Sequence, residues 1–151
     1  MNIVRVRAIS SADKNAWFEL WRGYLAFYET ALDPKVSEAT WRRMMDEREP
    51  IHGLVALAGD KAIGFVNYVL HANTWTEKPV CYLEDLFVDS TARGQGAGRA
   101  LIEAVIDLAK TQGWHRVYWQ TKASNTTARA LYDKIAPATD WVGYDVNVTS
   151  N

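Results

Sequence analysis

Three glycines within five residues form the clearest candidate for chemistry in this chain. The segment Arg93-Gly94-Gln95-Gly96-Ala97-Gly98 follows an apolar run and precedes a stretch with helical spacing. Glycines let a backbone approach a ligand closely, and the amide groups and dipole at the start of a helix favour an anion such as a phosphate or pyrophosphate. A glycine turn that joins a strand to a helix without any ligand is the alternative. Arg99 stands where the dinucleotide fingerprint needs glycine or alanine, and no P-loop lysine follows, so both of those motifs are weakened.

Two adjacent carboxylates, Glu84 and Asp85, interrupt the apolar run over residues 80–89. A carboxylate in an apolar strand can have a raised pKa, which suits a general base. In a regular strand the two side chains point to opposite faces, and a bulge would break that alternation. The sequence therefore leaves open whether Glu84, Asp85 or a water molecule would act as the base that takes a proton from a substrate. The structural alternative is that one carboxylate pairs with an arginine and neither is catalytic.

The elements that must position these residues follow from the spacing of apolar residues. A strand is expected over residues 3–9, a helix with an aromatic face over 17–28 that Pro34 stops, and a shorter helix over 37–47 capped by Ser37. The remaining expected elements are strands over 53–58 and 61–70 joined by a turn at 59–60, a polar stretch over 71–79, a strand over 80–89, a helix from Gly98 to Gly113, a strand over 117–121, a helix over 126–136 and a last strand over 141–148.

This order of elements predicts an α/β fold, a mixed sheet with helices on both faces. The strand over 80–89, the glycine loop, the following helix and the strand over 117–121 should close as a right-handed parallel crossover. Ligands of such sheets bind beyond the carboxyl ends of the strands, where the loop lies. No internal repeat, linker or low-complexity segment interrupts the sequence, so residues 1–151 are expected to form a single domain.

The composition of the chain limits which kinds of binding partner are expected. The chain has 151 residues, and its 17 basic residues nearly balance 18 acidic ones, so neither nucleic acid nor a membrane is expected as a partner. A single cysteine, Cys81, lies in an apolar run and cannot form an internal disulfide, which suits a cytoplasmic protein; the first nine residues resemble neither a signal peptide nor a membrane span. The three histidines are far apart and lack ligand spacing, so no metal is predicted.

Two linked motifs resemble those of the GNAT superfamily of N-acetyltransferases. Its pattern of arginine or glutamine, two residues, glycine, one residue and glycine or alanine is met by Arg93, Gly96 and Gly98. Its second pattern, Asn-x-x-Ala-x-x-Leu-Tyr, is met by Asn125, Ala128, Leu131 and Tyr132. The stretch Tyr82-Leu83-Glu84-Asp85-Leu86-Phe87-Val88 further resembles the branch of spermidine/spermine, thialysine and histone/polyamine-type acetyltransferases.

The resemblance implies a mixed, mostly antiparallel sheet of about six to seven strands and acetyl-CoA as the cosubstrate. The strand end at residues 86–88 would pair with the pantetheine arm and the loop would hold the pyrophosphate. By this resemblance Tyr132 would protonate the departing sulfur, and Glu84 would take a proton from the amine through water. The full set implied for acetyl-CoA is Leu86, Phe87, Val88, Arg93, Gly94, Gln95, Gly96, Ala97, Gly98, Arg99, Asn125, Ala128 and Tyr132.

The acceptor is expected to be a primary amine of a small molecule, such as a polyamine, an amino acid or a lysine analogue. Tyr24, Glu29, Glu84 and Asp85 are the candidates for binding it, through aromatic and carboxylate contacts with a cation. Acetylation of protein or histone lysine is one alternative, and a non-catalytic acyl-CoA-binding module is another. The aromatic cluster over residues 114–119 should pack the sheet or form a subunit interface, and a homodimer is expected.

Overall fold

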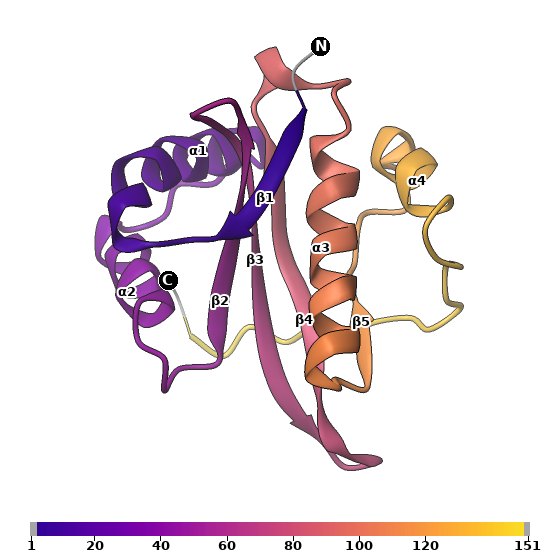
Figure 1. Ribbon diagram of the computed structural model, residues 1–151. Helices are drawn as coiled ribbons and strands as arrows, with labels where there is room; N and C mark the ends of the chain where they lie inside the picture. Colours follow the sequence, from indigo (N-terminus) through magenta and orange to yellow (C-terminus); the bar gives the residue numbers. More distant parts are fainter. Residues whose placement is uncertain (1–2, 150–151) are drawn as a thin grey trace. The chain divides into compact units, whose positions relative to one another are not determined.

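The computed structural model describes residues 3–149, and its main element is one five-stranded sheet (Figure 1). The chain forms two compact units, Met1–Trp119 and Gln120–Asn151, and each is described by itself. The first contains β1 (Val4–Ala8), η1 (Ser11–Asp13), α1 (Lys14–Phe27), α2 (Pro34–Met44), β2 (Ile51–Ala58), β3 (Lys61–Asn73), β4 (Thr76–Val88), η2 (Ser90–Ala92), α3 (Ala97–Gln112) and β5 (Arg116–Tyr118). The second contains α4 (Thr126–Tyr132).

The strands follow the order β1-β2-β3-β4-β5, antiparallel except for the parallel pair β4–β5. The mixed, mostly antiparallel sheet is therefore confirmed, but it has five strands where six to seven were expected. The difference lies in part at residues 141–148, which form no helix or strand. A strand exists only where a neighbour takes its backbone hydrogen bonds, and alternation of side chains alone does not supply that neighbour.

The β3–β4 hairpin is longer than the sequence indicated. Both strands have 13 residues, and pairing continues from His71 with Val80 to Asn73 with Thr76. Residues 71–79 were expected to be a polar connection. Their polar side chains are compatible with strand because this end of the hairpin is exposed, with Trp75 94% exposed at its turn.

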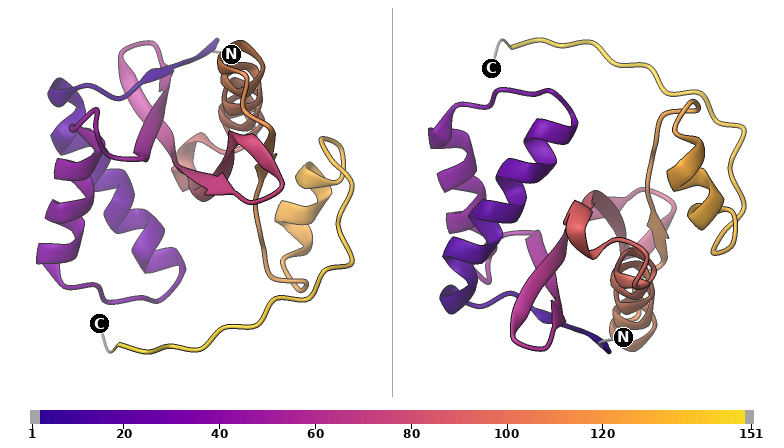
Figure 2. Two further views of the ribbon diagram at one scale, coloured as in Figure 1. Left: turned by 90° about the horizontal axis from the view of Figure 1, so that it is seen from below. Right: turned by 90° about the horizontal axis from the view of Figure 1, so that it is seen from above.

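Helices cover opposite faces of the sheet (Figure 2). On one face α1 and α2 enclose an aromatic core of Trp17, Leu20, Trp21, Trp41 and Phe65. On the other face α3 buries Leu101, Ile102 and Val105, and Tyr68 contacts Trp114. Successive side chains of a strand point to opposite faces, so odd-numbered residues near the middle of β3 face α1 and even-numbered ones face α3.

The second helix begins earlier than expected. Asp33 caps α2 by accepting a hydrogen bond from the backbone N–H of Lys35 at 2.9 Å, and Pro34 occupies the first turn. Proline is well tolerated there because its missing N–H has no helical partner in any case. Ser37, the expected cap, instead lies inside the helix, where its buried hydroxyl accepts a hydrogen bond from Trp21 Nε1 at 2.8 Å.

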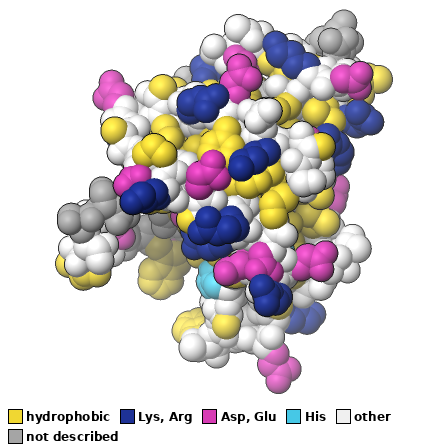
Figure 3. Space-filling model, turned by 90° about the vertical axis from the view of Figure 1, so that its left-hand side faces the viewer, with side chains coloured by type: hydrophobic (Ala, Val, Ile, Leu, Met, Phe, Trp, Pro, Cys, Tyr) yellow, Lys and Arg dark blue, Asp and Glu magenta, His cyan; other side chains and the backbone are white. Residues whose placement is uncertain are grey.

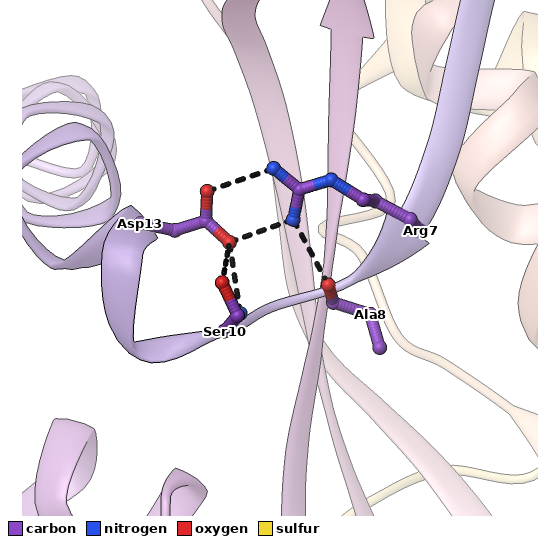
Figure 4. Close-up of polar contacts among 4 residues, drawn as sticks. All are labelled: Arg7, Ala8, Ser10 and Asp13. Atoms are coloured by element: carbon purple, nitrogen blue, oxygen red, sulfur yellow. Dashed lines mark hydrogen bonds and ion pairs between the residues drawn. The ribbon is translucent and has the colours of Figure 1, made fainter.

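An ion pair anchors β1 to the start of α1 (Figure 4). The Arg7 guanidinium donates to both carboxylate oxygens of Asp13, at 2.7 and 3.0 Å, and Ser10 N donates to the same carboxylate at 2.8 Å. The hydrogen bond from Arg7 is the main reason that the pKa of Asp13 is lowered to about 2. This contact joins β1 to the residue that precedes α1.

Candidate acetyl-transfer site

The glycine-rich segment forms the turn between β4 and α3. Gly94 and Gly96 have left-handed backbone conformations, with φ of 84° and 82°. A Cβ atom at either position would be strained in backbone conformation, yet it would meet no atom within 4 Å. The space beside both glycines is therefore open, and a ligand can approach this backbone closely.

The first amides of α3 point into the same turn region. Ala100 N donates to Gly96 O at 3.0 Å, which is the first bond of the helix. The N–H groups of Ala97, Gly98 and Arg99 precede it and have no carbonyl one turn earlier in the helix. Together with the helix dipole, these donors favour an anion, so the turn has the chemistry of a phosphate site.

The two arginines that flank the turn both have protein partners. Arg93 Nε donates to Val88 O at 3.3 Å, and its guanidinium lies 5.7 Å from the centre of the Phe27 ring. Arg99 Nε donates to Glu103 Oε1 at 2.7 Å on an exposed helix surface. Each guanidinium keeps further N–H donors, but the charge of Arg99 is partly offset by Glu103.

β5 pairs with only part of one edge of β4 (Figure 1). β5 pairs with residues 80–82 of β4, and the described pairing ends there, while β4 continues to Val88. On the opposite edge, residues 86–88 pair with residues 64–66 of β3. Among the described residues, the last part of β4 therefore has no strand neighbour on its β5 side. An extended ligand could take the backbone hydrogen bonds of that edge.

A β-bulge separates the two carboxylates. Asn67 pairs with Asp85 and the next residue, Tyr68, pairs with Leu83, so Glu84 is the extra residue with no partner across the strand. The bulge turns Asp85 toward the face covered by α1, the face on which Asn67 lies. Glu84 is exposed, whereas Asp85 is half-buried.

Asp85 is part of a hydrogen-bonded group that spans three elements. Asn67 Nδ2 donates to Asp85 Oδ2 at 3.1 Å, and Trp17 Nε1 donates to Asn67 Oδ1 at 3.2 Å. The Tyr24 hydroxyl lies close enough to Asp85 to lower the pKa of that carboxyl as a donor. We call Trp17, Asn67, Asp85 and Tyr24 the Asp85 network. Sequence reasoning missed Asn67, although an asparagine inside the apolar strand Gly-Phe-Val-Asn-Tyr-Val-Leu was an available signal.

Both carboxylates have raised pKa values. Burial raises the pKa of Asp85, and the hydrogen bonds from Tyr24 and Asn67 lower it in part. Partial desolvation raises the pKa of Glu84, Asp85 raises it further, and Arg43 lowers it. Each carboxyl therefore keeps a proton to higher pH than an ordinary surface acid does, which is the direction that suits proton transfer near neutral pH.

The structure brings three of the four candidate acceptor-binding residues together. Tyr24 lies close enough to both carboxylates for Asp85 and Glu84 to raise its pKa, and Asp85 raises the pKa of Glu84, the residue before it. Glu29 is exposed just beyond α1, with φ of 52°, and lies outside the network. On the side of the molecule where α1 and α2 lie, Figure 3 shows basic and acidic side chains interspersed, with hydrophobic side chains between them.

The second motif forms the start of α4 in the second unit. Asn125 Oδ1 accepts a hydrogen bond from Ala128 N at 3.2 Å, so the asparagine caps this helix. Tyr132 is the last helical residue, and its carbonyl accepts from Ile135 N at 2.9 Å. The spacing of asparagine and alanine thus has a local structural cause: the cap joins the side chain to the amide three residues later.

The described residues contain neither a metal site nor a membrane-spanning helix. Within residues 3–149, no group of three or more His, Cys, Asp or Glu side chains is arranged to hold a metal ion. No helix in that range is both long and apolar enough to cross a membrane. Cys81 is buried, and burial raises the pKa of its thiol to about 12, so it is a poor nucleophile.

Comparison with known proteins places this geometry in a family. The model of the acetyltransferase (GNAT) family matches residues 14–136. The D-amino-acid N-acetyltransferase HPA3 of Saccharomyces cerevisiae is 40% identical over 145 residues, which cover 94% of this chain and 89% of that protein. The thialysine N-epsilon-acetyltransferase of Mus musculus is 29% identical over 139 residues, which cover 83% of this chain and 81% of that protein.

Solved structures agree on the fold. A probable acetyltransferase superimposes with a TM-score of 0.86 at 20% identity, covering 97% of this chain and 99% of the other. An aminoglycoside acetyltransferase from an uncultured soil metagenomic sample, in complex with sisomicin, gives a TM-score of 0.82 at 22% identity, covering 97% of each chain. The family model and the yeast relative agree with the glycine turn and the partly paired edge of β4. The chain belongs to the acetyltransferase (GNAT) family and is an N-acetyltransferase.

Proposed function

We propose that this enzyme transfers the acetyl group of acetyl-CoA to a primary amine of a small molecule, by direct attack in a ternary complex. The observation that carries the proposal is the pairing of an open glycine turn at the start of α3 with the adjacent edge of β4 that lacks a strand neighbour. The turn suits a pyrophosphate and the edge suits a pantetheine arm, and the two lie next to each other along the chain.

The residues proposed for acetyl-CoA fall into three groups. The backbone of Leu86, Phe87 and Val88 would pair with the pantetheine arm. The amides from Arg93 through Gly94, Gln95, Gly96, Ala97 and Gly98 to Arg99 would hold the pyrophosphate. Asn125, Ala128 and Tyr132 would line the thioester; the cap that Asn125 makes to Ala128 gives this segment a defined shape.

Proton transfers are assigned to Glu84 and Tyr132. An alkyl ammonium has a pKa of ~10 and cannot attack a thioester, so a base must first take its proton. Glu84 would do so directly or through water; the neutral nitrogen then bonds to the carbonyl carbon as the carbon–sulfur bond breaks. Tyr132 would donate its phenolic proton to the departing sulfur. The products are an N-acetylated amine and free coenzyme A.

The proposed acceptor is a small cationic amine bound near Tyr24, Glu84 and Asp85, with Glu29 at the edge. Two relatives support this class: one is a D-amino-acid N-acetyltransferase and the other is a thialysine N-epsilon-acetyltransferase, and both of those substrates are amino acids. Glu84 and Asp85, whose pKa values are raised, supply carboxylate contacts for an ammonium group, and Tyr24 supplies an aromatic contact.

We further propose that residues 1–151 act as one acetyltransferase domain in the cytoplasm and that the enzyme is a homodimer. Val142, Tyr144, Val146 and Val148 alternate with polar residues and are 73–92% exposed. We call residues 141–148 the C-terminal arm. The Tyr144 side chains of two such arms would bury roughly 300–500 Å², a part of the roughly 1,200–2,000 Å² that a stable complex buries.

An acceptor panel tests the proposed function. Release of free thiol from acetyl-CoA is measured against polyamines, L- and D-amino acids, thialysine, aminoglycosides and histone-tail peptides. The proposal expects saturable turnover with a small primary amine, at kcat/KM at least tenfold above that for any peptide. Preference for a peptide would favour a protein lysine acetyltransferase. Tight binding of acetyl-CoA without turnover on any amine would favour a non-catalytic module.

A further inference from the structure

Asn67 is a polar residue in the middle of an apolar strand. Its side chain is 1% exposed, and it lies on the face of the sheet where Trp17 and Phe65 are also almost fully buried. Burying an amide is costly unless all its hydrogen bonds are made, and an apolar side chain of the same size would pack the strand without that cost. The amide therefore needs an explanation beyond packing.

The two partners of Asn67 fix the direction of its amide. An indole N–H can only donate, so the Asn67 oxygen must face Trp17. The amide NH2 is then left to face Asp85, to which it donates at 3.1 Å. Trp17 is itself held by stacking on Trp21, with ring centroids 5.1 Å apart. A rigid aromatic core thus determines which group is presented to the Asp85 carboxylate.

Two groups from different elements act on Asp85. Asn67 on β3 donates a hydrogen bond to it, and Tyr24 on α1 lies close enough to lower its pKa as a donor. A carboxylate accepts about four hydrogen bonds, so roughly two positions remain for an N–H donor from outside. Asp85 as a residue is half-buried rather than fully enclosed.

We propose that Asn67 is a positioning residue, which holds the Asp85 carboxylate in the orientation that binds the ammonium group of the acceptor. This inference rests on the proposed function, because it assigns a role within the same site. Glu84 keeps the proton-transfer role and Asp85 supplies the fixed anion. The bulge points the two carboxylates in different directions, so one can take a proton from the amine while the other binds its charge.

The pKa of Asp85 reports whether the hydrogen bond from Asn67 is made. The groups that act on it are Tyr24 from α1 and Asn67 from β3. Asp85 in turn raises the pKa of Glu84 on β4, while Tyr28 acts on Tyr24 and Arg43 of α2 acts on Glu84. A hydrogen bond donated to a carboxylate stabilises its charged form. Loss of the Asn67 donor therefore raises the pKa of Asp85, and the charged form is reached only at higher pH.

The test compares Asn67→Leu with Asn67→Thr, which keeps a hydroxyl donor in a residue suited to a strand. With the best amine of the acceptor panel, Asn67→Leu should raise the KM for the amine roughly 10- to 100-fold, the value of a hydrogen bond to a charged group. The KM for acetyl-CoA should not change, kcat should fall less than KM rises, and Asn67→Thr should lie between Leu and wild type. The acid limb of kcat/KM should move to higher pH.

Ser37→Ala is the matched control. It removes a buried hydrogen bond from another indole of the same core, that of Trp21, and so it lowers stability while it leaves the hydrogen bonds of Asn67 with Trp17 and Asp85 in place. It should leave the KM for the amine and the pH profile unchanged. An Asn67→Leu protein that folds and has the amine KM and pH profile of wild type would overturn the proposal, as would equal effects of Ser37→Ala.

A measurement without turnover separates this inference from the proposed function. In protein labelled with ¹³C at aspartate carboxyl carbons, the resonance missing from Asp85→Asn identifies Asp85, and it should titrate at higher pH in Asn67→Leu than in wild type. If Asn67→Leu fails to fold, Asn67→Thr carries the same comparison with a smaller shift. An unchanged titration overturns the positioning role. A wild-type enzyme that acetylates no amine, with the titration shift present, overturns only the proposed function.

Discussion

Residues of the same type in this enzyme differ in their acid–base chemistry because their surroundings differ. Glu84 and Asp85 are neighbours in sequence, yet one is exposed and the other half-buried and held by Asn67. Loss of solvent around the carboxyl group is the first cause of the raised pKa of both; Tyr24 and Asn67 partly restore the charged form of Asp85, and Arg43 partly restores that of Glu84. The two residues therefore have different chemistry, although they are both acids.

The proposed base is tested by Glu84→Gln. A base must be ionised to work, so wild-type kcat/KM should fall as the pH drops through the pKa of Glu84, which is raised above that of an ordinary glutamate. Without it, only amine that is already neutral can react, and the rate should rise about tenfold per pH unit below the amine pKa of ~10. Initial rates between pH 5.5 and 10 measure this. Matching profiles for the two proteins would assign proton removal to another group.

The proposed acid is tested by Tyr132→Phe. Loss of the phenolic proton leaves a thiolate to depart unaided, so kcat should fall roughly 10²–10⁴-fold, the usual contribution of general acid catalysis. Acetyl-CoA should bind as before, as isothermal titration calorimetry can measure. Tyr144→Phe, which changes an exposed tyrosine of the same unit, is the control and should retain activity. Full activity in Tyr132→Phe would remove the tyrosine from the mechanism.

At the scale of elements, the start of α3 combines two features that local sequence produces together. Gly96 ends the turn in a left-handed conformation, and the helix then begins with three amides that have no helical acceptor. The far end of α3 is capped by Gly113, also left-handed, with φ of 75°. The same kind of glycine thus serves a candidate ligand site at one end and only helix termination at the other.

This symmetry makes a controlled prediction possible. Both Gly96→Ala and Gly113→Ala force a side chain into a left-handed conformation and should each lower stability by roughly 1 kcal/mol. Only Gly96→Ala places a methyl group in the open space proposed for the pyrophosphate, so only it should raise the Kd for acetyl-CoA, by tenfold or more. Calorimetry gives the affinity and thermal unfolding gives the stability. Equal affinities in the two variants would contradict the phosphate site.

For the whole molecule, the near balance of charge means that association depends on apolar surface rather than on a net electrostatic field. The C-terminal arm provides such surface, with four apolar side chains at alternate positions. That alternation is typical of a strand with one buried face. A second copy of the chain offers a cover for the arm, and in a two-fold dimer both arms are covered at once.

The expected outcome is a dimer in solution at micromolar concentration, measured by light scattering during size-exclusion chromatography. Tyr144→Asp with Val146→Asp should shift it toward the monomer, since two carboxylates would enter the buried face. Trp75→Asp, which changes an exposed aromatic residue at the β3–β4 turn, is the matched control and should remain dimeric. A wild-type monomer at these concentrations would exclude the proposed assembly.

The sequence by itself determined the features that depend on near neighbours along the chain. The glycine turn lies between a strand and a helix, as expected, because left-handed glycines and helix starts are local properties. The turn at residues 59–60, the helix ending before Gly113 and the family motifs were predictable for the same reason. The mixed sheet followed from the order of elements.

Only the tertiary structure decided the features that depend on register and on distant partners. The bulge at Glu84 arises from the pairing of β4 with β3, and it alone determines which face Asp85 points to. The Asp85 network joins residues 17, 24, 67 and 85 from three elements, and no periodicity in the sequence relates them. Likewise, alternation over residues 141–148 indicated a strand, but a strand also needs a neighbour, which the alternating pattern does not encode.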